Sequence, residues 1–185
     1  MDLEGCCNNL PQDNRMHFVP CGLVEMASLM DKLPRQEYDV FYHFAWMGSA
    51  GPARADTRLQ LNKAQWTVDS LRVAKKLGCQ RFLCAGSIME HETMAAAYTQ
   101  GNKPGLGYIC GSGKLIAHVM CISVAAEIGI DLIWPEIPNA YGVGEKSPRM
   151  INTTIQKCIR GEAPQFTAVT QNYDFVYIDD VSRLA

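Results

Sequence analysis

The sequence has no excess of basic residues, no Cys-x-x-Cys pair and no long apolar run. Seventeen lysines and arginines stand against nineteen aspartates and glutamates, which gives a formal net charge of −2. That balance offers no positive surface for nucleic acid or anionic membrane. The eight cysteines fall below the roughly 8–10% of a disulfide scaffold. None is spaced as Cys-x-x-Cys, which disfavours a zinc ribbon or thioredoxin-type site and favours free thiols.

The N-terminus lacks the pattern of a secretory signal, because Met-Asp-Leu-Glu-Gly-Cys-Cys has no basic region followed by an apolar core. The most apolar stretch, residues 115–130, is interrupted by His118, Ser123 and Glu127. It is also shorter than the ~20 residues of a membrane span. With 185 residues, 48% of them hydrophobic, the composition predicts a globular, cytoplasmic enzyme without membrane or nucleic-acid partners.

Short apolar segments alternate with segments of helical periodicity. We predict strands at residues 17–19, 38–45, 81–85, 130–134, 166–170 and 175–178, and loops at 87–107 and 135–148. We predict helices at 23–33, 57–77, 110–128 and 150–160, and one opening after Asp180. In the helix at 57–77, Leu61, Ala64, Val68 and Leu71 recur at helical spacing. This alternation predicts a parallel sheet with helices on both faces.

Three glycine pairs invite comparison with phosphate-binding loops: Gly105-Leu-Gly107, Gly111-Ser-Gly113 and Gly142-Val-Gly144. Each lacks the rest of its pattern, and no strand runs directly into the first, so we predict turns. Glu90-His91-Glu92 alternates in a segment expected to be an exposed loop, with no distant histidine or cysteine set, so no metal site is predicted. Asp179-Asp180 is interpreted as the cap of a helix.

A stronger pattern is distributed along the chain. Its segments are Tyr38-Asp-Val-Phe-Tyr-His-Phe-Ala-Trp46, Asn62, Arg81-Phe-Leu-Cys-Ala-Gly-Ser87, Lys114, Asn139-Ala-Tyr-Gly142 and Tyr173-Asp-Phe-Val-Tyr-Ile-Asp-Asp-Val181. In this order and spacing the chain resembles the extended short-chain dehydrogenase/reductases, the NAD-dependent epimerase/dehydratase family acting on nucleotide sugars.

The resemblance implies an α/β fold, a doubly wound parallel sheet of the Rossmann-like NAD(P)-binding type that lacks its first βαβ unit. Residues 1–16 would be a polar tail and residues 17–134 a partial NAD(P)-binding domain. Residues 135–185 would form part of a substrate-binding region that returns to the core near 174–185. It also implies a homodimer formed through the helices at about 57–77 and 110–128.

The resemblance also assigns roles residue by residue. Ser87 would orient a sugar oxygen, and Lys114 would hold the nicotinamide ribose and lower the pKa of the acid–base group. NAD or NADP would meet His43, Ala45, Trp46, Asn62, Ala85, Lys114 and Pro138. The nucleotide sugar would meet Ser87, Glu90, Asn139, Arg149 and Asn172.

The chain departs from the family at the acid–base position. Four residues before Lys114 stands Cys110 in place of the family's tyrosine, and a thiol reaches less far than a phenol. Tyr108 lies six residues before Lys114, about 240° around a helix, although a loop position would leave its geometry open. Both residues are therefore candidates. Ile88-Met89 stands where dehydratases of the family carry Asp-Glu, which disfavours dehydration.

Three further family features are not found. The first strand with its glycine loop and helix is missing, and so is the next strand with its ribose-binding acid. The acid that usually follows the short strand near Val19 is replaced by Gly22. We therefore expect a chain truncated at both ends, with weak NAD binding and low stability. The first hypothesis is an NAD(P)-dependent nucleotide-sugar epimerase or reductase that transfers hydride at a sugar carbon. The alternative is a catalytically impaired fragment or a non-catalytic binding or oligomerisation module.

Overall fold

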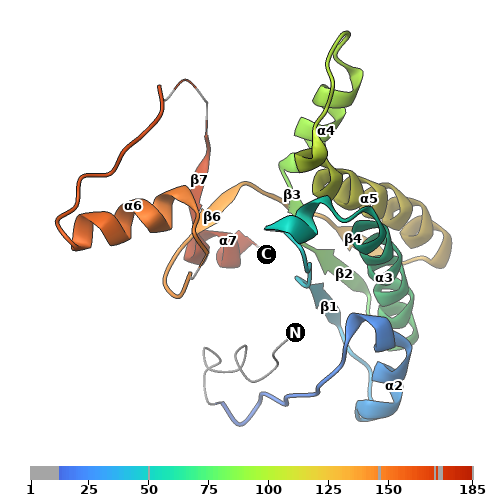
Figure 1. The fold of residues 1–185 in the computed structure, drawn as a ribbon. Helices are drawn as coiled ribbons and strands as arrows, with labels where there is room; N and C mark the ends of the chain where they lie inside the picture. The colour runs from blue at the N-terminus through green and yellow to red at the C-terminus, as the bar shows by residue number, and fades with distance from the viewer. Residues whose placement is uncertain (1–12, 50, 146, 169, 171–172, 185) are drawn as a thin grey trace.

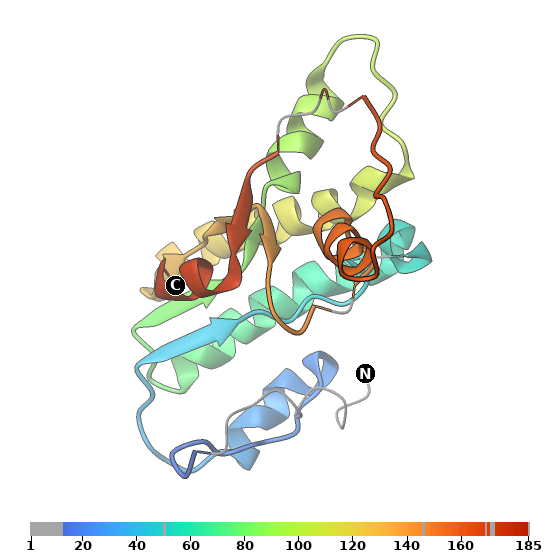
Figure 2. The ribbon, with the colours of Figure 1, turned by 90° about the vertical axis from the view of Figure 1, so that its left-hand side faces the viewer.

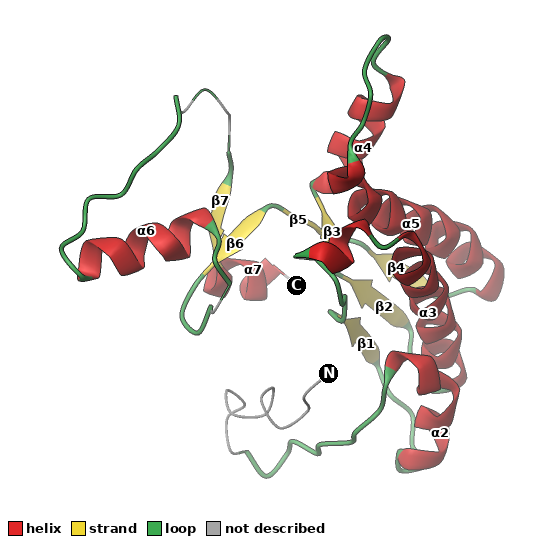
Figure 3. Cartoon of the chain, in the orientation of Figure 1, coloured by secondary structure: helices red, strands yellow, loops and turns green. Residues whose placement is uncertain are grey.

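The computed structural model describes residues 13–49, 51–145, 147–168, 170 and 173–184. Helices and strands alternate along the chain (Figures 1 and 3). In order they are η2 (Leu23–Ser28), α2 (Leu29–Lys32), β1 (Val40–His43), η3 (Pro52–Ala55), α3 (Thr57–Lys76), β2 (Arg81–Cys84), β3 (Gly86–Ser87), α4 (Met89–Tyr98), η4 (Leu106–Tyr108), α5 (Ile109–Ile128), β4 (Asp131–Ile133), β5 (Glu136–Ile137), β6 (Asn139–Tyr141), α6 (Met150–Ile159), β7 (Phe175–Tyr177) and α7 (Ile178–Leu184).

The central sheet has the strand order β1-β2-β4, and both pairings are parallel. Parallel neighbours require crossover connections, which α3 supplies between β1 and β2 and α5 between β2 and β4. Two separate two-stranded sheets, β3 with β5 and β6 with β7, are also parallel. The predicted α/β class with a parallel sheet is confirmed.

Helices α3 and α5 lie side by side against one face of this sheet (Figures 1 and 2). Between them and β2 the core buries Leu71, Phe82 and Cys121 completely, each at 0% exposure. Burial of such a large apolar side chain contributes roughly 1.5–3 kcal/mol. On the opposite face Tyr42 and Ile133 are 54% and 40% exposed. Leu83, which is in register with both of them, is 1% exposed. Within the described residues, the two long helices lie on one face of the sheet.

The sequence missed several short elements. The loop predicted at 87–107 contains β3, α4 and η4, and the loop predicted at 135–148 contains β5 and β6. The strands predicted at 17–19 and 166–170 are absent from the described residues there. A strand forms only where a neighbour supplies hydrogen bonds, and local composition does not reveal that neighbour.

Gly111 and Gly113 lie inside α5, so the prediction of turns at this pair is wrong. A Cβ on Gly111 would meet the Thr93 hydroxyl of α4 and stand 2.8 Å from the Met89 carbonyl oxygen. A Cβ on Gly113 would stand 2.9 Å from that of Gln60 on α3. These glycines therefore permit α5 to approach both neighbouring helices closely.

By length and composition, the segment Leu106–Ile128 is the one helix among the described residues that could cross a membrane. In the structure its inner side packs on α3 and the sheet through Ala117, Cys121 and Ala125, each at most 3% exposed. The core accounts for part of the apolar character of α5, since 33% of its most apolar window is buried.

Candidate active site

The carboxyl ends of β1 and β2 bring together several of the predicted residues. The Ala85 amide donates to the His43 carbonyl at 3.1 Å, which joins the chain leaving β2 to the end of β1. The Lys114 ammonium reaches over from α5 and donates to the Ala85 carbonyl at 2.6 Å. Its Nζ also lies 4.8 Å from the centre of the Trp46 ring. Ligands of open α/β sheets bind at this end of the strands.

The Trp46 indole is fixed by a buried glutamine that the sequence did not identify. The Trp46 Nε1 donates to Gln60 Oε1 at 3.1 Å. The Gln60 amide in turn donates to the carbonyls of Gly48 and Ala53, both at 3.0 Å. Gln60 is only 1% exposed, so the loop after β1 is pinned to α3 and holds the indole against Lys114.

Lys63, which the sequence also missed, is buried beside this group. The residue is 1% exposed, and its Nζ has no hydrogen-bond partner among the described residues. It lies 5.9 Å from the ring centres of both Trp46 and Trp66. Burial lowers the pKa of Lys63 to about 8; the neighbouring Cys110 opposes this shift and Lys114 adds to it.

Asn62, predicted to support the cofactor, is exposed on α3. The next residue is turned by about 100° around the helix, and its side chain is buried. The residue that faces the site is Lys63. A polar stripe at helical spacing, Gln60, Lys63, Thr67 and Ser70, is the signal that could have revealed it.

His43 and Lys114 both have a lowered pKa. Burial lowers the pKa of His43 to about 4, with further effects from Lys114 and Lys63. Its Nε2 lies 3.3 Å from the Thr67 hydroxyl, and its ring stacks on Phe82. Burial also lowers the pKa of Lys114, while Cys84, Glu90 and Cys110 oppose the shift. Uncharged His43 therefore lies beside cationic lysines without repelling them.

The two candidates for acid–base work occupy different positions. Cys110 is 5% exposed and stands one turn before Lys114 in α5. Tyr108 ends η4 with helical backbone angles (φ −84°, ψ −9°). Because Tyr108 has helical backbone angles, its position six residues before Lys114 puts the two residues on different faces of the helix. Cys110 is the candidate that shares the Lys114 face.

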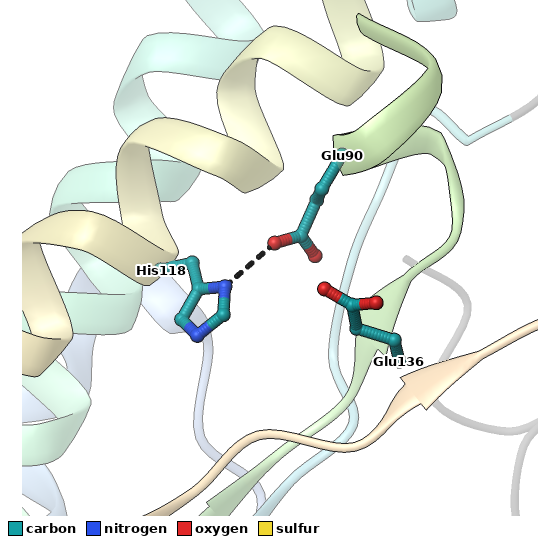
Figure 4. Close-up of side chains that lie close together, drawn as sticks. All are labelled: Glu90, His118 and Glu136. Atoms are coloured by element: carbon teal, nitrogen blue, oxygen red, sulfur yellow. Dashed lines mark hydrogen bonds and ion pairs between the residues drawn. The ribbon is translucent and has the colours of Figure 1, made fainter. Parts of the chain in front are cut away.

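Ser87 lies at the end of β3, beside a buried carboxylate. Its Oγ accepts from the Met89 amide at 3.3 Å, and its own amide donates to Glu90 Oε1 at 2.9 Å. Glu90 was predicted in an exposed loop and as a substrate contact; it is instead 1% exposed. It also accepts from Trp134 Nε1 at 3.1 Å and pairs with His118 Nδ1 at 2.8 Å (Figure 4). The start of α4 explains the difference, because it turns Glu90 inward.

Two more of the predicted substrate residues, Asn139 and Arg149, belong to the part of the chain that holds β6, α6 and β7, here called the β6–β7 unit. The backbone and side-chain amides of Asn139 lie 3.2 and 3.5 Å from the Asp174 carbonyl that accepts from them. Arg149 is exposed before α6, 3.8 Å from Glu145. In Figure 1 this unit lies to the left of the sheet, apart from α3 and α5. Pro138 precedes β6, Ala45 follows β1 beside Trp46, and Asn172 lies outside the described residues.

The fold is similar to that of solved epimerases. A UDP-glucuronic acid 4-epimerase from Bacillus cereus, in complex with UDP-glucuronic acid and NAD, matches 97% of this chain at 20% identity, with a TM-score of 0.72. A UDP-N-acetylglucosamine 4-epimerase from Methanobrevibacter ruminantium M1 matches 95% at 17% identity, with a TM-score of 0.73. The chain covers 57% and 58% of the length of those two proteins. No curated protein matches the chain.

A sequence model of the NAD dependent epimerase/dehydratase family matches residues 2–185, which is nearly the whole chain. The family resemblance inferred from the six sequence segments is thereby confirmed. This chain belongs to the NAD-dependent epimerase/dehydratase family.

Proposed function

We propose that this chain belongs to an enzyme that transfers hydride between NAD and a sugar carbon of a nucleotide sugar, as an epimerase or reductase. The observation that carries the proposal is the position of Lys114. Its ammonium is held by the Ala85 carbonyl and the Trp46 ring, one turn after Cys110, where the parallel strands end. The similar solved proteins are UDP-sugar 4-epimerases, which makes UDP-sugars the first substrates to test.

The side chains around Lys114 suit the ribose end of a nicotinamide nucleotide. An ammonium has three N–H donors, and the structure gives Lys114 one acceptor, the Ala85 carbonyl. The buried Nζ of Lys63 has no partner among the described residues. Both amines would donate to ribose hydroxyls, with the Trp46 ring beside them. When bound, NAD supplies the hydride acceptor and donor.

The residues of this chain would handle the proton and the sugar oxygen. Because the Ser87 hydroxyl already accepts from the Met89 amide, its own O–H is free to donate to a sugar oxygen. Cys110 occupies the acid–base position, and Lys63 beside it has a pKa of about 8, close to the range in which proton carriers are most effective.

We also propose that two copies pair through α3 and α5, in the cytoplasm. These helices expose the apolar side chains of Leu61, Val119, Met120 and Ile122, which are 48–56% exposed. Val119 and Ile122 are three residues apart and therefore share one face of α5. Analytical ultracentrifugation of Ile122→Glu would give a monomer if this face pairs. A wild-type monomer at high concentration would contradict the pairing.

Nicotinamide mononucleotide tests the proposed cofactor site directly, because it carries the ribose end without the rest of the dinucleotide. We expect it to quench tryptophan fluorescence through Trp46. Lys114→Met should weaken its binding about 10-fold or more, since a hydrogen bond to a charged group contributes roughly 1.5–3 kcal/mol. Lys76→Met, an exposed lysine of α3, is the matched control. The absence of quenching at millimolar ligand would contradict the assignment.

An activity assay over a panel of UDP-sugars tests the reaction. Restoring a phenol with Cys110→Tyr should raise turnover, because general acid–base catalysis contributes about 10²–10⁴ in rate. Ser87→Ala and Lys114→Ala should remove that gain, whereas Tyr108→Phe should change little. If Tyr108→Phe abolishes activity and Cys110→Tyr leaves it unchanged, Tyr108 is the acid–base residue. Unchanged, inactive variants would favour the non-catalytic alternative.

A further inference from the structure

Four polar side chains from three elements meet beside Ser87. Glu90 and His91 lie in the first turn of α4. His118 projects from α5 and Glu136 begins β5; Figure 4 draws both of them with Glu90. One donor atom each of Glu90, His118 and Glu136 lie within 4.8 Å of one another. The fourth donor, His91 Nε2, lies 2.6 Å from Glu136 Oε2. The sequence predicted no metal here because it placed residues 90–92 in a solvated loop.

We propose that Glu90, His91, His118 and Glu136 bind a divalent transition-metal ion of the Zn²⁺ type. Two imidazoles and two carboxylates are a ligand set that Zn²⁺ accepts in tetrahedral geometry, with metal–ligand distances of about 2.0–2.2 Å. Those distances place neighbouring donors roughly 3.4 Å apart. The two hydrogen-bonded pairs are now 2.6 and 2.8 Å long, and one donor each of Glu90, His118 and Glu136 lie within 4.8 Å of one another. The exposed His91 side chain, which contacts Glu136, would move toward the other donors on binding. Mg²⁺ and Ca²⁺, which prefer oxygen ligands, suit this set less well.

The residues behind the cluster hold its two innermost ligands in position. Glu90 Oε1 accepts from the Ser87 amide at 2.9 Å and from Trp134 Nε1 at 3.1 Å. Its other oxygen, Oε2, is thereby directed toward His118. The His118 ring stacks on Trp134, with ring centres 4.5 Å apart and planes 4° from parallel. Such supporting contacts orient the ligands of metal sites.

The charge balance favours a dication. Glu90 is 1% exposed, and a second carboxylate, that of Glu136, lies within 4.8 Å of the same imidazole. Two carboxylates and two neutral imidazoles carry a charge of about −2, which one Zn²⁺ neutralises.

The site would act as a clamp on the fold. It would link α4, α5 and β5, and it has a path from solvent because the His91 side chain is 62% exposed and that of Glu136 is 33% exposed. With four protein ligands the ion would have no open position for substrate, which is typical of structural zinc. Through Glu90, the ion would fix the backbone amide of Ser87. The inference does not depend on the proposed hydride transfer.

Calorimetry of the metal-free protein with ZnCl₂ provides the test. We expect one equivalent to bind and the thermal midpoint to rise with it. Glu136→Gln and His91→Gln change partly exposed side chains and should each weaken Zn²⁺ binding about 10-fold or more. Glu92→Gln, an exposed carboxylate of the same helix, should leave the affinity within about twofold. His118→Gln, checked for folding by circular dichroism, should behave like Glu136→Gln.

Thiols are the competing ligands, because Cys158 is exposed and Cys21 is partly exposed. Cobalt(II) separates the two cases: the proposed site gives visible d–d bands of a tetrahedral ion without thiolate charge transfer. A Cys21→Ser/Cys158→Ser variant should therefore retain both the bands and the equivalent of metal. The proposal is overturned if Glu136→Gln and His91→Gln bind Zn²⁺ like the wild type, if the cysteine variant loses the metal, or if no binding occurs.

Discussion

The replacement of Lys63 by methionine should stabilise this protein, although it removes a buried side chain that packs between two indoles. The Nζ of Lys63 has no hydrogen-bond partner among the described residues, and the residue is 1% exposed. Its charge is partly compensated by Trp46 and Trp66 at 5.9 Å. Methionine keeps most of the volume and the contact with the rings, while it abolishes the charge.

The expected gain follows from the pKa. In the unfolded chain the amine titrates near its usual 10.5, whereas burial lowers the pKa to about 8 in the folded protein. At about 1.4 kcal/mol per pH unit, folding at pH 7 loses up to roughly 3 kcal/mol through this group. We expect Lys63→Met to recover about 1–3 kcal/mol, or roughly 2–12 °C in melting temperature for a chain of this size.

The pH dependence identifies the cause. Because the folded pKa is lower than the unfolded one, the wild type should gain stability as the pH rises from about 8 to about 10.5. The advantage of Lys63→Met should shrink over the same range. Urea unfolding of both proteins at pH 7 and at about pH 10 measures this difference, and the groups common to both cancel. Lys76→Met, at an exposed position of α3, should show neither effect.

Two results would refute this reasoning. If Lys63→Met is less stable than the wild type at pH 7, the ammonium has a stabilising partner, and Cys110 is the neighbour that raises the pKa of Lys63. If Lys63→Met is more stable by an amount that does not change with pH, the gain comes from packing alone.

Two other substitutions test the fold around the site. The pKa of His43 is lowered to about 4, so the folded protein loses stability as the pH falls below about 6.5. In urea unfolding, the wild type should lose on the order of 2 kcal/mol more than His43→Gln between pH 7 and pH 5. Equal losses would show that His43 is not held neutral. Gly111→Ala should destabilise the protein by about 1–3 kcal/mol, because the added Cβ meets the Thr93 hydroxyl and the Met89 carbonyl. Gly107→Ala, with open space around it, is the control and should hardly change the midpoint of thermal unfolding. Equal midpoints for the two variants would show that α4 and α5 can separate at no cost.

Elements with long, regular patterns could be predicted from the sequence. The helix predicted at 57–77 is α3 (Thr57–Lys76), and that predicted at 110–128 is α5 (Ile109–Ile128). β1 and β2 were also predicted, because apolar runs flanked by turns are strong signals. The α4 helix was missed because the residues from 89 to 98 show no apolar face; of these, only Glu90, Thr93 and Ala96 are buried. The α4 helix is positioned by its packing on α5, and a local sequence pattern does not reveal this tertiary contact.

Site residues that belong to a distinctive sequence motif could be predicted, whereas residues whose position depends on packing against distant segments could not. Lys114, placed in the family motif, lies against Ala85 and Trp46 in the structure. Asn62 was predicted because the family carries an asparagine there, and Lys63, which the helix phase buries, was not singled out. Glu90 and His118, 28 positions apart in the sequence, become partners only through the packing of α4 on α5.

An unpaired ammonium in a core is a cost that folding alone does not explain, so its effect on ligand binding is informative. If ribose hydroxyls accept from Lys63, binding provides the missing partners and offsets part of the roughly 3 kcal/mol lost at pH 7. Nicotinamide mononucleotide should then raise the melting temperature of the wild type more than that of Lys63→Met at equal saturation. Equal shifts would mean that the ligand leaves Lys63 unpartnered. A larger shift in the wild type that disappears near pH 10, where the amine is neutral in the folded protein, would tie the stability cost of Lys63 to its place in the site.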